Sequence, residues 1–464
     1  MTQKFRLPNR GRIERDVPVN FTFNGRHYQG YRGDTLASAL LANGVRLVGR
    51  SFKYHRPRGI MAAGAEEPNA LVQLETGART LADHQATLVE LYEGLIADSV
   101  NCWPSPGFDV MAVNNWFHRI LPSGFYYKTF MWPTSGWKIY EYFIRRAAGL
   151  GHSPHEPDPD HYDRMNIHCD VLVVGSGPAG LLATLSAGRA GARVVLADDQ
   201  PELGGGLLAE RAEIDGGPAM DWVSAAEAEL ETMTDITVLK RTSAFGYYDH
   251  NFIGMIETRS AKICDGGGVS RQRLWRVRAR QVVLATGAIE RPLVFSDNDR
   301  PGVMLAGAVR TYVNRYGVTP GKRIAVFTNN DDAYRTALDL VEAGVEVAAV
   351  IDLRSDPGGE LPTRAVEQDI EVLDDTAITG VIGVHGVRGI EVMSLNADGD
   401  GVVGDARVVD CDVVCSSGGW NPAVHLHSHS GGKAEFEDER NIFVPGETIQ
   451  AVRSAGAANG DFSL

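Results

Sequence analysis

Alternating apolar and polar positions near the start of the chain predict a small unit built around a β-hairpin. Residues 19–23 and 27–31 alternate in this way and flank Asn24-Gly25, a pair that tolerates positive φ and is typical of two-residue hairpin turns. Asp34 then stands where it can cap a helix that carries leucines on one face. Hairpin, helix and a following strand together predict a β-grasp domain.

Farther along the chain the pattern changes to apolar runs separated by amphipathic helical stretches. This alternation begins at Asp170 and is typical of a parallel sheet that is covered by helices on both faces. Short buried strands are expected at residues 282–285 and 324–327, and the β-branched residues and glycines of residues 377–395 favour antiparallel strands. We therefore predict an α/β domain that begins near Cys169.

The stretch between these two parts is rich in aromatic residues. Residues 103–143 contain 13 aromatic side chains, among them four of the seven tryptophans of the chain. Because a short connector cannot bury so many rings within itself, segment 122–133 is either packing between domains or a surface for a partner subunit, and both interpretations stay open. Prolines 154, 157 and 159 mark a stiff polar linker after it.

A glycine-rich loop follows the first strand of the α/β part. The apolar residues 171–174 run directly into Gly175, Gly177 and Gly180, and an apolar helical stretch follows. At this spacing the first glycine makes the tight turn, the second lets the backbone approach a pyrophosphate, and the third permits close packing of the helix. The N-terminus of the helix adds unpaired N–H groups and the positive end of its dipole. The pattern predicts a dinucleotide site.

An acidic residue stands at the end of the next predicted strand. Residues 193–197 form this strand, and Asp198 follows it, where a carboxylate can bind the hydroxyls of an adenosine ribose. Since no arginine comes directly after it, a 2′-phosphate would be repelled, which favours NAD over NADP. We assign thirteen residues to the nucleotide site: Gly175, Ser176, Gly177, Pro178, Ala179, Gly180, Asp198, Asp199, Gly205, Ala285, Thr286, Gly287 and Gly456.

Other segments resemble parts of two-dinucleotide-binding flavoproteins of the disulfide-reductase type. Residues 284–288 resemble the strand and turn that close over the dinucleotide. In that architecture a second Rossmann unit would begin at Ile324, but bulky residues occupy its glycine positions and two aspartates would face the phosphate. These residues are Thr328, Asn330, Asp331, Asp332 and Ala333. We therefore predict that the second unit holds no pyrophosphate.

Flavin-binding members of this class end with a Gly-Asp pair whose carboxylate holds the ribityl chain. Here the equivalent segment is Ala455-Gly456-Ala457, which lacks that carboxylate. The ADP half of a dinucleotide therefore keeps its predicted contacts, while a flavin half loses one.

Composition and charge limit the function classes. The chain of 464 residues has a net charge of −14, which repels nucleic acids and anionic membranes, and it contains no apolar run long enough to span a membrane. Residues 1–12 lack the apolar core of a signal peptide, so we expect a cytoplasmic protein. Five scattered cysteines, with no Cys-x-x-Cys pair and none before Cys102, favour buried thiols over a metal site or a thiol relay.

A cluster of basic side chains contrasts with this negative charge. Residues 46–58 carry six cationic or titratable side chains interleaved with Phe52 and Tyr54. The cluster is either a solvated loop or an anion-binding surface.

Several segments together resemble the alpha subunit of heterotetrameric sarcosine oxidase, over essentially the whole chain. They are Ser51-Phe-Lys-Tyr-His-Arg-Pro-Arg-Gly59, the cysteine-free β-grasp domain before the aromatic connector, Gly175-x-Gly-x-x-Gly180, Thr328-Asn-Asn-Asp-Asp332 and Ser454-Ala-Gly-Ala457. The first and last of these motifs are distinctive, whereas many oxidoreductases share the glycine triplet.

The resemblance implies cofactors and partners. Such an alpha subunit binds NAD without a covalent bond, a beta subunit carries FAD and oxidises the amine, and FMN lies at the interface of the two. Lys53 and Arg56 are then candidate contacts of the FMN phosphate. The implied partners are beta, gamma and delta subunits. The implied reaction converts sarcosine, O2 and tetrahydrofolate into glycine, methylenetetrahydrofolate and H2O2.

We assign no catalytic residue to this chain. It ends at Leu464, directly after the last motif, so we interpret it as a fragment without the folate-binding region of the family.

The expected architecture has three parts. Residues 1–101 form a β-grasp domain, like a 2Fe-2S ferredoxin without its cluster, and residues 102–168 form the connector. Residues 169–464 form an α/β domain of the FAD/NAD(P)-binding, disulfide-reductase-like Rossmann type, with a degenerate second Rossmann-like unit inserted at about 305–415.

Three alternatives remain. A freestanding FAD- and NAD-dependent oxidoreductase, with FAD at the glycine-rich loop, needs a second glycine-rich site and a flavin carboxylate. A subunit of a related amine or opine dehydrogenase uses cysteine ligands for an iron-sulfur cluster in the β-grasp domain. A non-catalytic scaffold would bind no nucleotide.

Overall fold

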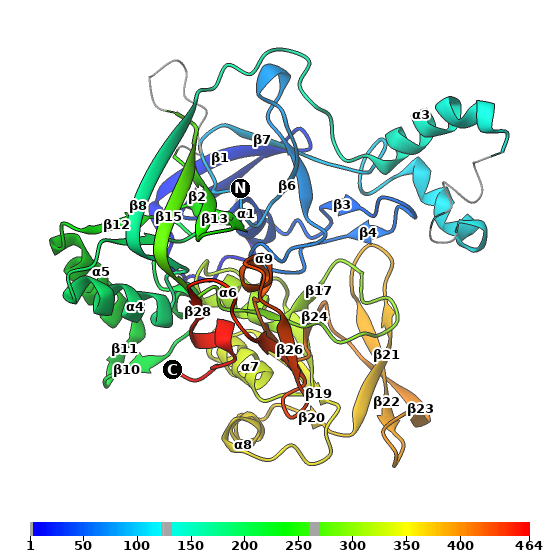
Figure 1. The fold of residues 1–464 in the computed structure, drawn as a ribbon. Coiled ribbons are helices and arrows are strands. Elements are labelled where there is room, and N and C mark those ends of the chain that lie inside the picture. The colour runs from blue at the N-terminus through cyan, green and yellow to red at the C-terminus, as the bar shows by residue number, and fades with distance from the viewer. Residues whose placement is uncertain (1–2, 122–123, 125–131, 260–269) are drawn as a thin grey trace. The chain divides into compact units, whose positions relative to one another are not determined.

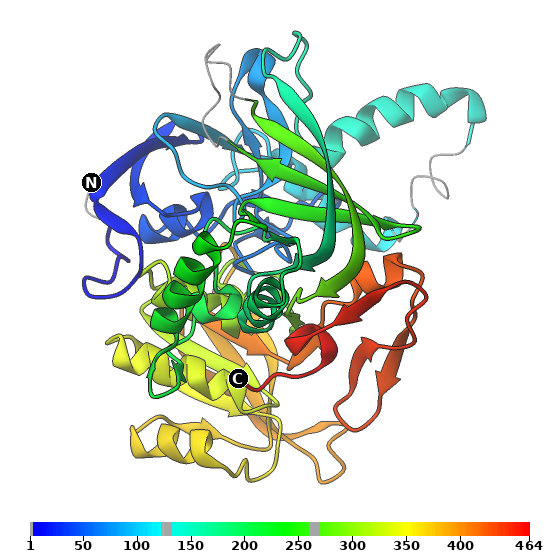
Figure 2. The same ribbon diagram turned by 60° about the vertical axis from the view of Figure 1, so that its left-hand side comes forward.

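The computed structural model describes residues 3–121, 124, 132–259 and 270–464 (Figure 1 and Figure 2). The chain divides into two compact units. The first comprises Met1–Pro159 and Pro292–Gly418, and the second comprises Asp160–Arg291 and Gly419–Leu464. The segment that contains the degenerate second Rossmann-like unit therefore groups with the N-terminal part of the chain.

A five-stranded sheet in the order β2-β1-β7-β5-β6 forms the N-terminal part of the first unit. Its strands are β1 (Glu14–Phe23), β2 (Arg26–Arg32), β5 (Leu71–Leu74), β6 (Leu81–Gln85) and β7 (Leu95–Ser99). The predicted hairpin is confirmed, because β1 and β2 pair antiparallel and Asn24 and Gly25 adopt φ of 49° and 71° between them. Helix α1 (Leu36–Ala42) is buried along its whole length.

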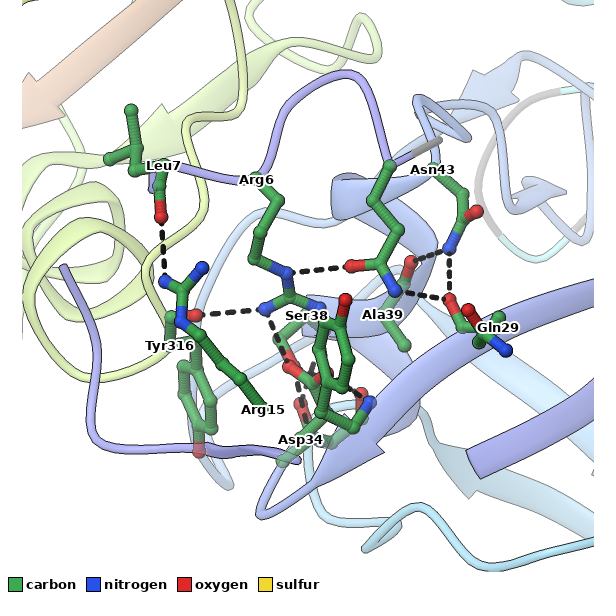
Figure 3. Close-up of polar contacts among 12 residues, drawn as sticks. Arg6, Leu7, Arg15, Gln29, Asp34, Ser38, Ala39, Asn43 and Tyr316 are labelled. Atoms are coloured by element: carbon green, nitrogen blue, oxygen red, sulfur yellow. Dashed lines mark hydrogen bonds and ion pairs between the residues drawn. The ribbon is translucent and has the colours of Figure 1, made fainter. Parts of the chain in front are cut away.

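The cap of α1 differs from the prediction. Thr35, not Asp34, is the N-cap, because its side chain accepts the backbone N–H of Ser38 and the Ser38 hydroxyl accepts the N–H of Thr35. Asp34 is buried and instead accepts hydrogen bonds from Nη1 and Nη2 of Arg6, at 3.0 and 2.7 Å (Figure 3). Its charge is therefore compensated by Arg6, and its contact with the helix is the hydrogen bond that it accepts from the Ser38 hydroxyl at 2.6 Å, not a cap on a backbone N–H.

Short elements complete the N-terminal segment of the first unit. They are β3 (Gly49–Arg50), β4 (Pro57–Arg58), η1 (Gly77–Arg79), η2 (Val110–Ile120), η3 (Thr134–Gly136) and α3 (Trp137–Ala148). Most of the predicted aromatic stretch 122–133 lies outside the described residues.

The C-terminal segment of the first unit contains a parallel sheet in the order β17-β24-β18-β19-β20. The elements are β17 (Val303–Leu305), α6 (Ala306–Asn314), β18 (Arg323–Thr328), α7 (Asp332–Glu342), β19 (Glu346–Asp352), α8 (Glu360–Glu367), β20 (Val372–Leu373) and β24 (Val413–Ser417). An antiparallel sheet of β21 (Thr376–Ile382), β22 (Gly389–Leu395) and β23 (Val402–Val409) confirms the strands predicted at residues 377–395.

The second unit is built on a sheet in the order β12-β9-β8-β15-β14-β13, with β28 beside β15. The elements are β8 (Tyr162–Val174), α4 (Pro178–Arg189), β9 (Val194–Ala197), η4 (Gly205–Leu208), β10 (Glu213–Ile214), β11 (Gly217–Pro218), α5 (Ala219–Thr232), β12 (Ile236–Leu239), β13 (Thr242–Tyr248), β14 (Phe252–Thr258), β15 (Gln272–Leu284), β16 (Ala288–Glu290), β25 (Trp420–Pro422), α9 (His425–His429), β26 (Ala434–Glu437), β27 (Ile442–Pro445), β28 (Val452–Ser454) and η5 (Gly456–Asn459). Helices α4 and α5 pack against each other (Figure 2).

Two strand boundaries differ from the prediction. Strand β8 begins at Tyr162, upstream of the apolar residues 171–174 where the strand was predicted, and β15 extends well upstream of residues 282–285. The two strands pair in parallel from Tyr162 opposite Gln272 to Val174 opposite Leu284. Their upstream halves are polar and partly exposed, so no apolar run marks them, and pairing across more than 100 residues of sequence forms the strands instead.

Candidate functional site

The glycine-rich loop lies in the second unit, between strand β8 and helix α4. Gly175 has a φ of +100°, and a Cβ there would lie 2.2 Å from the carbonyl oxygen of Ala285. At Gly180 a Cβ would lie 1.9 Å from the carbonyl oxygen of Gly175. Both separations are far below van der Waals contact, so the fold of this loop itself requires glycine at these two positions.

Gly177 differs from these two glycines, because a Cβ there would meet no atom within 4 Å. It is the N-cap of α4, and Pro178 follows in the first turn, so the backbone N–H groups that open the helix have no helical partner. The open space above Gly177 therefore lies where the helix presents its N–H groups and positive dipole end.

The side chain of Ser176 adds an orphaned polar atom at the same place. Ser176 is fully buried, and its Oγ has no hydrogen-bond partner among the residues that the structure describes. A buried hydroxyl without a partner is costly, and a phosphate oxygen is an acceptor that would satisfy it. The loop therefore fits an anionic ligand.

Asp198 is placed at the loop, as predicted, but it also holds the loop together. The residue is buried after β9, and its Oδ2 accepts the backbone N–H of Ser176 at 2.6 Å while its Oδ1 accepts that of Gln200 at 2.8 Å. Asp199 is exposed beside it, and its Oδ1 accepts the side chain of Gln200 at 3.3 Å. Because each carboxylate oxygen has two lone pairs, Asp198 keeps acceptors for ribose hydroxyls. The motif alone did not indicate that Asp198 also accepts these backbone N–H groups and stabilises the loop.

The other predicted site residues surround the same loop. Gly205 has a φ of +54°, and a Cβ there would lie 2.8 Å from the Cα of Gly177. A Cβ at Gly456 would lie 2.7 Å from the Cβ of Ala179 at the start of α4. In the turn after β15, the N–H of Ala285 donates to Val174, the hydroxyl of Thr286 donates to the carbonyl of Ala423, and Gly287 has a φ of +72°. Residues far apart in sequence thus form one small cradle.

The degenerate Rossmann-like segment, at about 305–415, belongs to the first compact unit. It carries charged side chains of its own at the start of its helix α7 and at the end of its strand β19. Asp352 at the end of β19 is fully buried and accepts hydrogen bonds from the hydroxyl of Tyr334 at 2.8 Å and from Nη2 of Arg354 at 2.8 Å. Arg354 also pairs with Asp331 beside the start of α7, at 2.8 Å. The acid of this segment is thus paired internally with an arginine, and the absence of a pyrophosphate here stays a prediction.

The predicted FMN contacts, Lys53 and Arg56, lie in the loop between β3 and β4. The guanidinium of Arg56 pairs with Asp297 and with Asp299, the latter at 2.7 Å, and Arg58 and Arg300 join the same group. These three arginines face two carboxylates, which leaves an excess positive charge. Lys53 lies with its Nζ 4.6 Å from the ring centre of Tyr54. The structure thus shows carboxylate partners of Arg56 that the sequence pattern did not indicate.

A buried pair beside this loop was missed by the sequence reasoning. His55 Nδ1 lies 2.7 Å from Oδ2 of Asp109, and Nε2 of the same ring is buried without a partner among the described residues. Burial raises the pKa of Asp109, but the hydrogen bonds from His55 and from the backbone outweigh it and hold the pKa below its ordinary value. The sequence did not indicate this pair, because its two residues are 54 positions apart and no local motif connects them.

Aromatic side chains of the connector are widely exposed. Trp116 is 81% exposed, Trp132 85% and Phe143 65% in the first unit. Large exposed rings are compatible with an interaction surface, since tryptophan and other aromatic residues are enriched at interfaces. The thiols behave as predicted in one respect, since Cys169, Cys411 and Cys415 are buried.

Comparison with known proteins places this geometry in a class. Residues 16–102 match a family model described as a 2Fe-2S iron-sulfur cluster binding domain, and residues 170–237 match one described as a FAD dependent oxidoreductase. The fold is similar to the crystal structure of L-proline dehydrogenase from P. horikoshii, with a TM-score of 0.63 and 18% identity over 98% of this chain and 71% of that chain. The predicted fold class is confirmed, and the chain contains a domain of the flavin- or nucleotide-binding type.

Two curated relatives specify the family. The chain is 48% identical over 456 residues to sarcosine oxidase subunit alpha of Rhizobium meliloti (strain 1021), which covers 98% of this chain and 45% of the relative. It is 39% identical over 452 residues to sarcosine oxidase subunit alpha of Corynebacterium sp. (strain U-96), which covers 97% of this chain and 42% of the relative. The chain is a homologue of the sarcosine oxidase alpha subunits, as its motifs predict, and it spans less than half of their length.

The helices of the described residues are all too short or too polar to cross a membrane.

Proposed function

We propose that this chain is the NAD-binding part of the alpha subunit of a sarcosine-oxidising complex. The observation that carries the proposal is the cradle in which open space above Gly177 meets the unpartnered hydroxyl of Ser176 and the N-terminus of α4. Here the pyrophosphate would bind to backbone N–H groups, and Asp198 or Asp199 would bind the adenosine ribose. NAD, when bound, supplies a nicotinamide that can exchange hydride, and the chain's own residues bind and orient it.

The proposal extends to the rest of the complex by homology. A beta subunit carries FAD and oxidises the amine, FMN lies between the two, and gamma and delta subunits complete the assembly. Sarcosine is oxidised with O2 and tetrahydrofolate to glycine, methylenetetrahydrofolate and H2O2, and the complex is cytoplasmic. The exposed rings at Trp116, Trp132 and Phe143 support a subunit interface at the connector.

A second candidate is FAD at the same cradle, either in a freestanding oxidoreductase or in a related amine or opine dehydrogenase subunit. The family match of residues 170–237 favours it, whereas Ala457 stands where flavin-binding members carry a carboxylate for the ribityl chain. Mass spectrometry of nucleotides released from the purified, denatured protein distinguishes the candidates. We expect one NAD per chain; stoichiometric FAD would replace the proposal with the second candidate, and no nucleotide would indicate a scaffold.

Replacing Asp198 with Asn is expected to weaken NAD binding by about 1–3 kcal/mol, the scale of hydrogen bonds to a charged group. The amide loses acceptor capacity both for the ribose and for the N–H groups of Ser176 and Gln200. Isothermal titration with NAD measures the effect, and Asp215→Asn, an exposed carboxylate of the same unit, is the control. Equal affinity of the two variants would contradict the assignment.

Replacing Lys53 and Arg56 together with Ala is expected to lower the FMN content of the assembled complex. The reason is that Lys53 and the excess charge of the arginine group offer the cations that a phosphate requires. The FMN content per alpha chain is read from the flavin absorbance of the complex and from released FMN. Arg26→Ala, an exposed cation of the same unit, is the control. A double variant that assembles with its full FMN would refute the phosphate role.

A further inference from the structure

The domain that matches a 2Fe-2S family model lacks the usual cluster ligands. The model covers residues 16–102, but the first 101 residues contain no cysteine. Thiolates hold such clusters, so the donor set of this domain does not fit the group. The loop between β4 and β5 instead contains a buried carboxylate side chain.

That side chain is Glu67, which is 1% exposed. Its Oε2 accepts the backbone N–H groups of Met61 at 2.7 Å and Ala62 at 2.6 Å, and its Oε1 accepts those of Asn69 at 2.7 Å and Ala70 at 2.9 Å. Four N–H donors thus converge on one carboxylate from both sides of the loop. Burial raises the pKa of Glu67 above its ordinary value, although the four amides act in the opposite direction.

The position of Glu67 follows the spacing of cluster ligands. Plant-type ferredoxins place three ligands in the pattern C-x4-C-x2-C. Ala62, Glu67 and Ala70 reproduce this spacing, and both alanines are fully buried and donate their N–H groups to the carboxylate. The three positions that the spacing selects therefore meet in the structure, together with Met61 and Asn69.

A fourth position lies beside this loop, in the segment that directly follows β6. Thr87 is buried, and its hydroxyl donates to the carbonyl of Gly64 at 2.8 Å. The N–H of the preceding residue, Ala86, donates to the carbonyl of Ala70 at 2.8 Å. A side chain at position 87 is thus next to the loop, as the distant fourth ligand of a plant-type site must be.

We propose that Glu67 replaces the iron-sulfur cluster of this domain, and that its carboxylate is the internal anion on which the N–H groups of residues 61–70 are organised. The domain keeps the loop of a ferredoxin and fills its centre with a side chain. Two observations carry this inference: the convergence of four amides on one buried carboxylate, and the ligand spacing of the residues that take part.

The first test compares Glu67→Gln with Glu66→Gln. A Gln side chain offers one acceptor oxygen and turns its NH2 group toward two backbone N–H donors, which remain unsatisfied. We expect Glu67→Gln to lower the Tm by at least about 5 °C and to speed hydrogen exchange in residues 59–70. Glu66 is exposed, so Glu66→Gln should change neither. Equal behaviour of the two variants would overturn the proposal.

The second test restores the ligands. The variant Ala62→Cys/Glu67→Cys/Ala70→Cys/Thr87→Cys, reconstituted with iron and sulfide in the full chain, should bind two iron and two sulfide per chain and show the visible absorption of a 2Fe-2S centre. The triple variant that retains Glu67 should not, and the unaltered chain should contain neither iron nor acid-labile sulfide. A folded quadruple variant without a cluster, or a cluster in the unaltered chain, would overturn the proposal. If the quadruple variant does not fold, the glutamine pair decides.

Discussion

Replacing Gly177 with Ala is expected to abolish tight dinucleotide binding while the protein stays folded. A Cβ at this position meets no atom within 4 Å, and the φ of −64° suits any residue, so the folded chain accommodates it. The cost of Ala at an N-cap is about 1 kcal/mol or less. The same methyl group, however, occupies the space through which the pyrophosphate approaches the backbone. We expect a loss of NAD affinity of about 100-fold or more, which is about 2.7 kcal/mol.

The neighbouring glycines are the matched comparison. Gly180→Ala would place its Cβ 1.9 Å from the carbonyl oxygen of Gly175, so the loop must move and the second unit is expected to lose stability as well as binding. Titration with NAD and thermal unfolding, measured on both variants, separate the two effects. Normal NAD affinity of Gly177→Ala would show that no pyrophosphate lies above this residue, and the proposed function would then lose its main support.

Local spacing explains why the geometry of the glycine-rich loop was predictable. Gly180 meets its constraint within the loop, at the carbonyl of Gly175, and Asp198 stands one strand away, so the sequence motif contains part of the geometry. The constraint on Gly175 is the carbonyl of Ala285, which lies far along the chain and which the motif does not show. The hairpin at Asn24-Gly25 was predictable for the same reason, because its turn depends on two adjacent residues.

Long-range pairing explains what was missed. The partners of Arg56, Asp297 and Asp299, follow it by more than 240 residues, and no spacing rule connects them. The N-terminal half of β15 exists because it pairs with β8, although its exposed positions are polar. The absence of cysteines did not indicate Glu67 either, and the spacing of Ala62, Glu67 and Ala70 gained a meaning only when the structure showed amides of this loop converging on the carboxylate. Asp34 was wrongly predicted to cap α1 for a similar reason, because its partner Arg6 lies 28 residues before it in the sequence.

The buried pair of Arg6 and Asp34 is expected to make a large electrostatic contribution to the stability of the first unit. Asp34 accepts two hydrogen bonds from Arg6 and further ones from the N–H of Tyr31 and the hydroxyl of Ser38, while Arg6 also donates to the carbonyl of Tyr316 at 2.8 Å (Figure 3). The side chain of Asp34 is fully buried and that of Arg6 is 6% exposed. Each charge therefore depends on the other.

Removing either partner alone leaves a buried charge uncompensated, so Arg6→Met and Asp34→Asn should each lower the free energy of unfolding by about 3–5 kcal/mol. The double variant Arg6→Met/Asp34→Asn leaves no charge behind and should lose clearly less than the sum of the two. The exposed pair of Arg32 and Glu14 is the control, for which Arg32→Met should cost at most about 1 kcal/mol. Denaturant unfolding of the four variants measures these values. Additive losses in the double variant would show that the two side chains contribute independently, and the buried charges would then not stabilise each other.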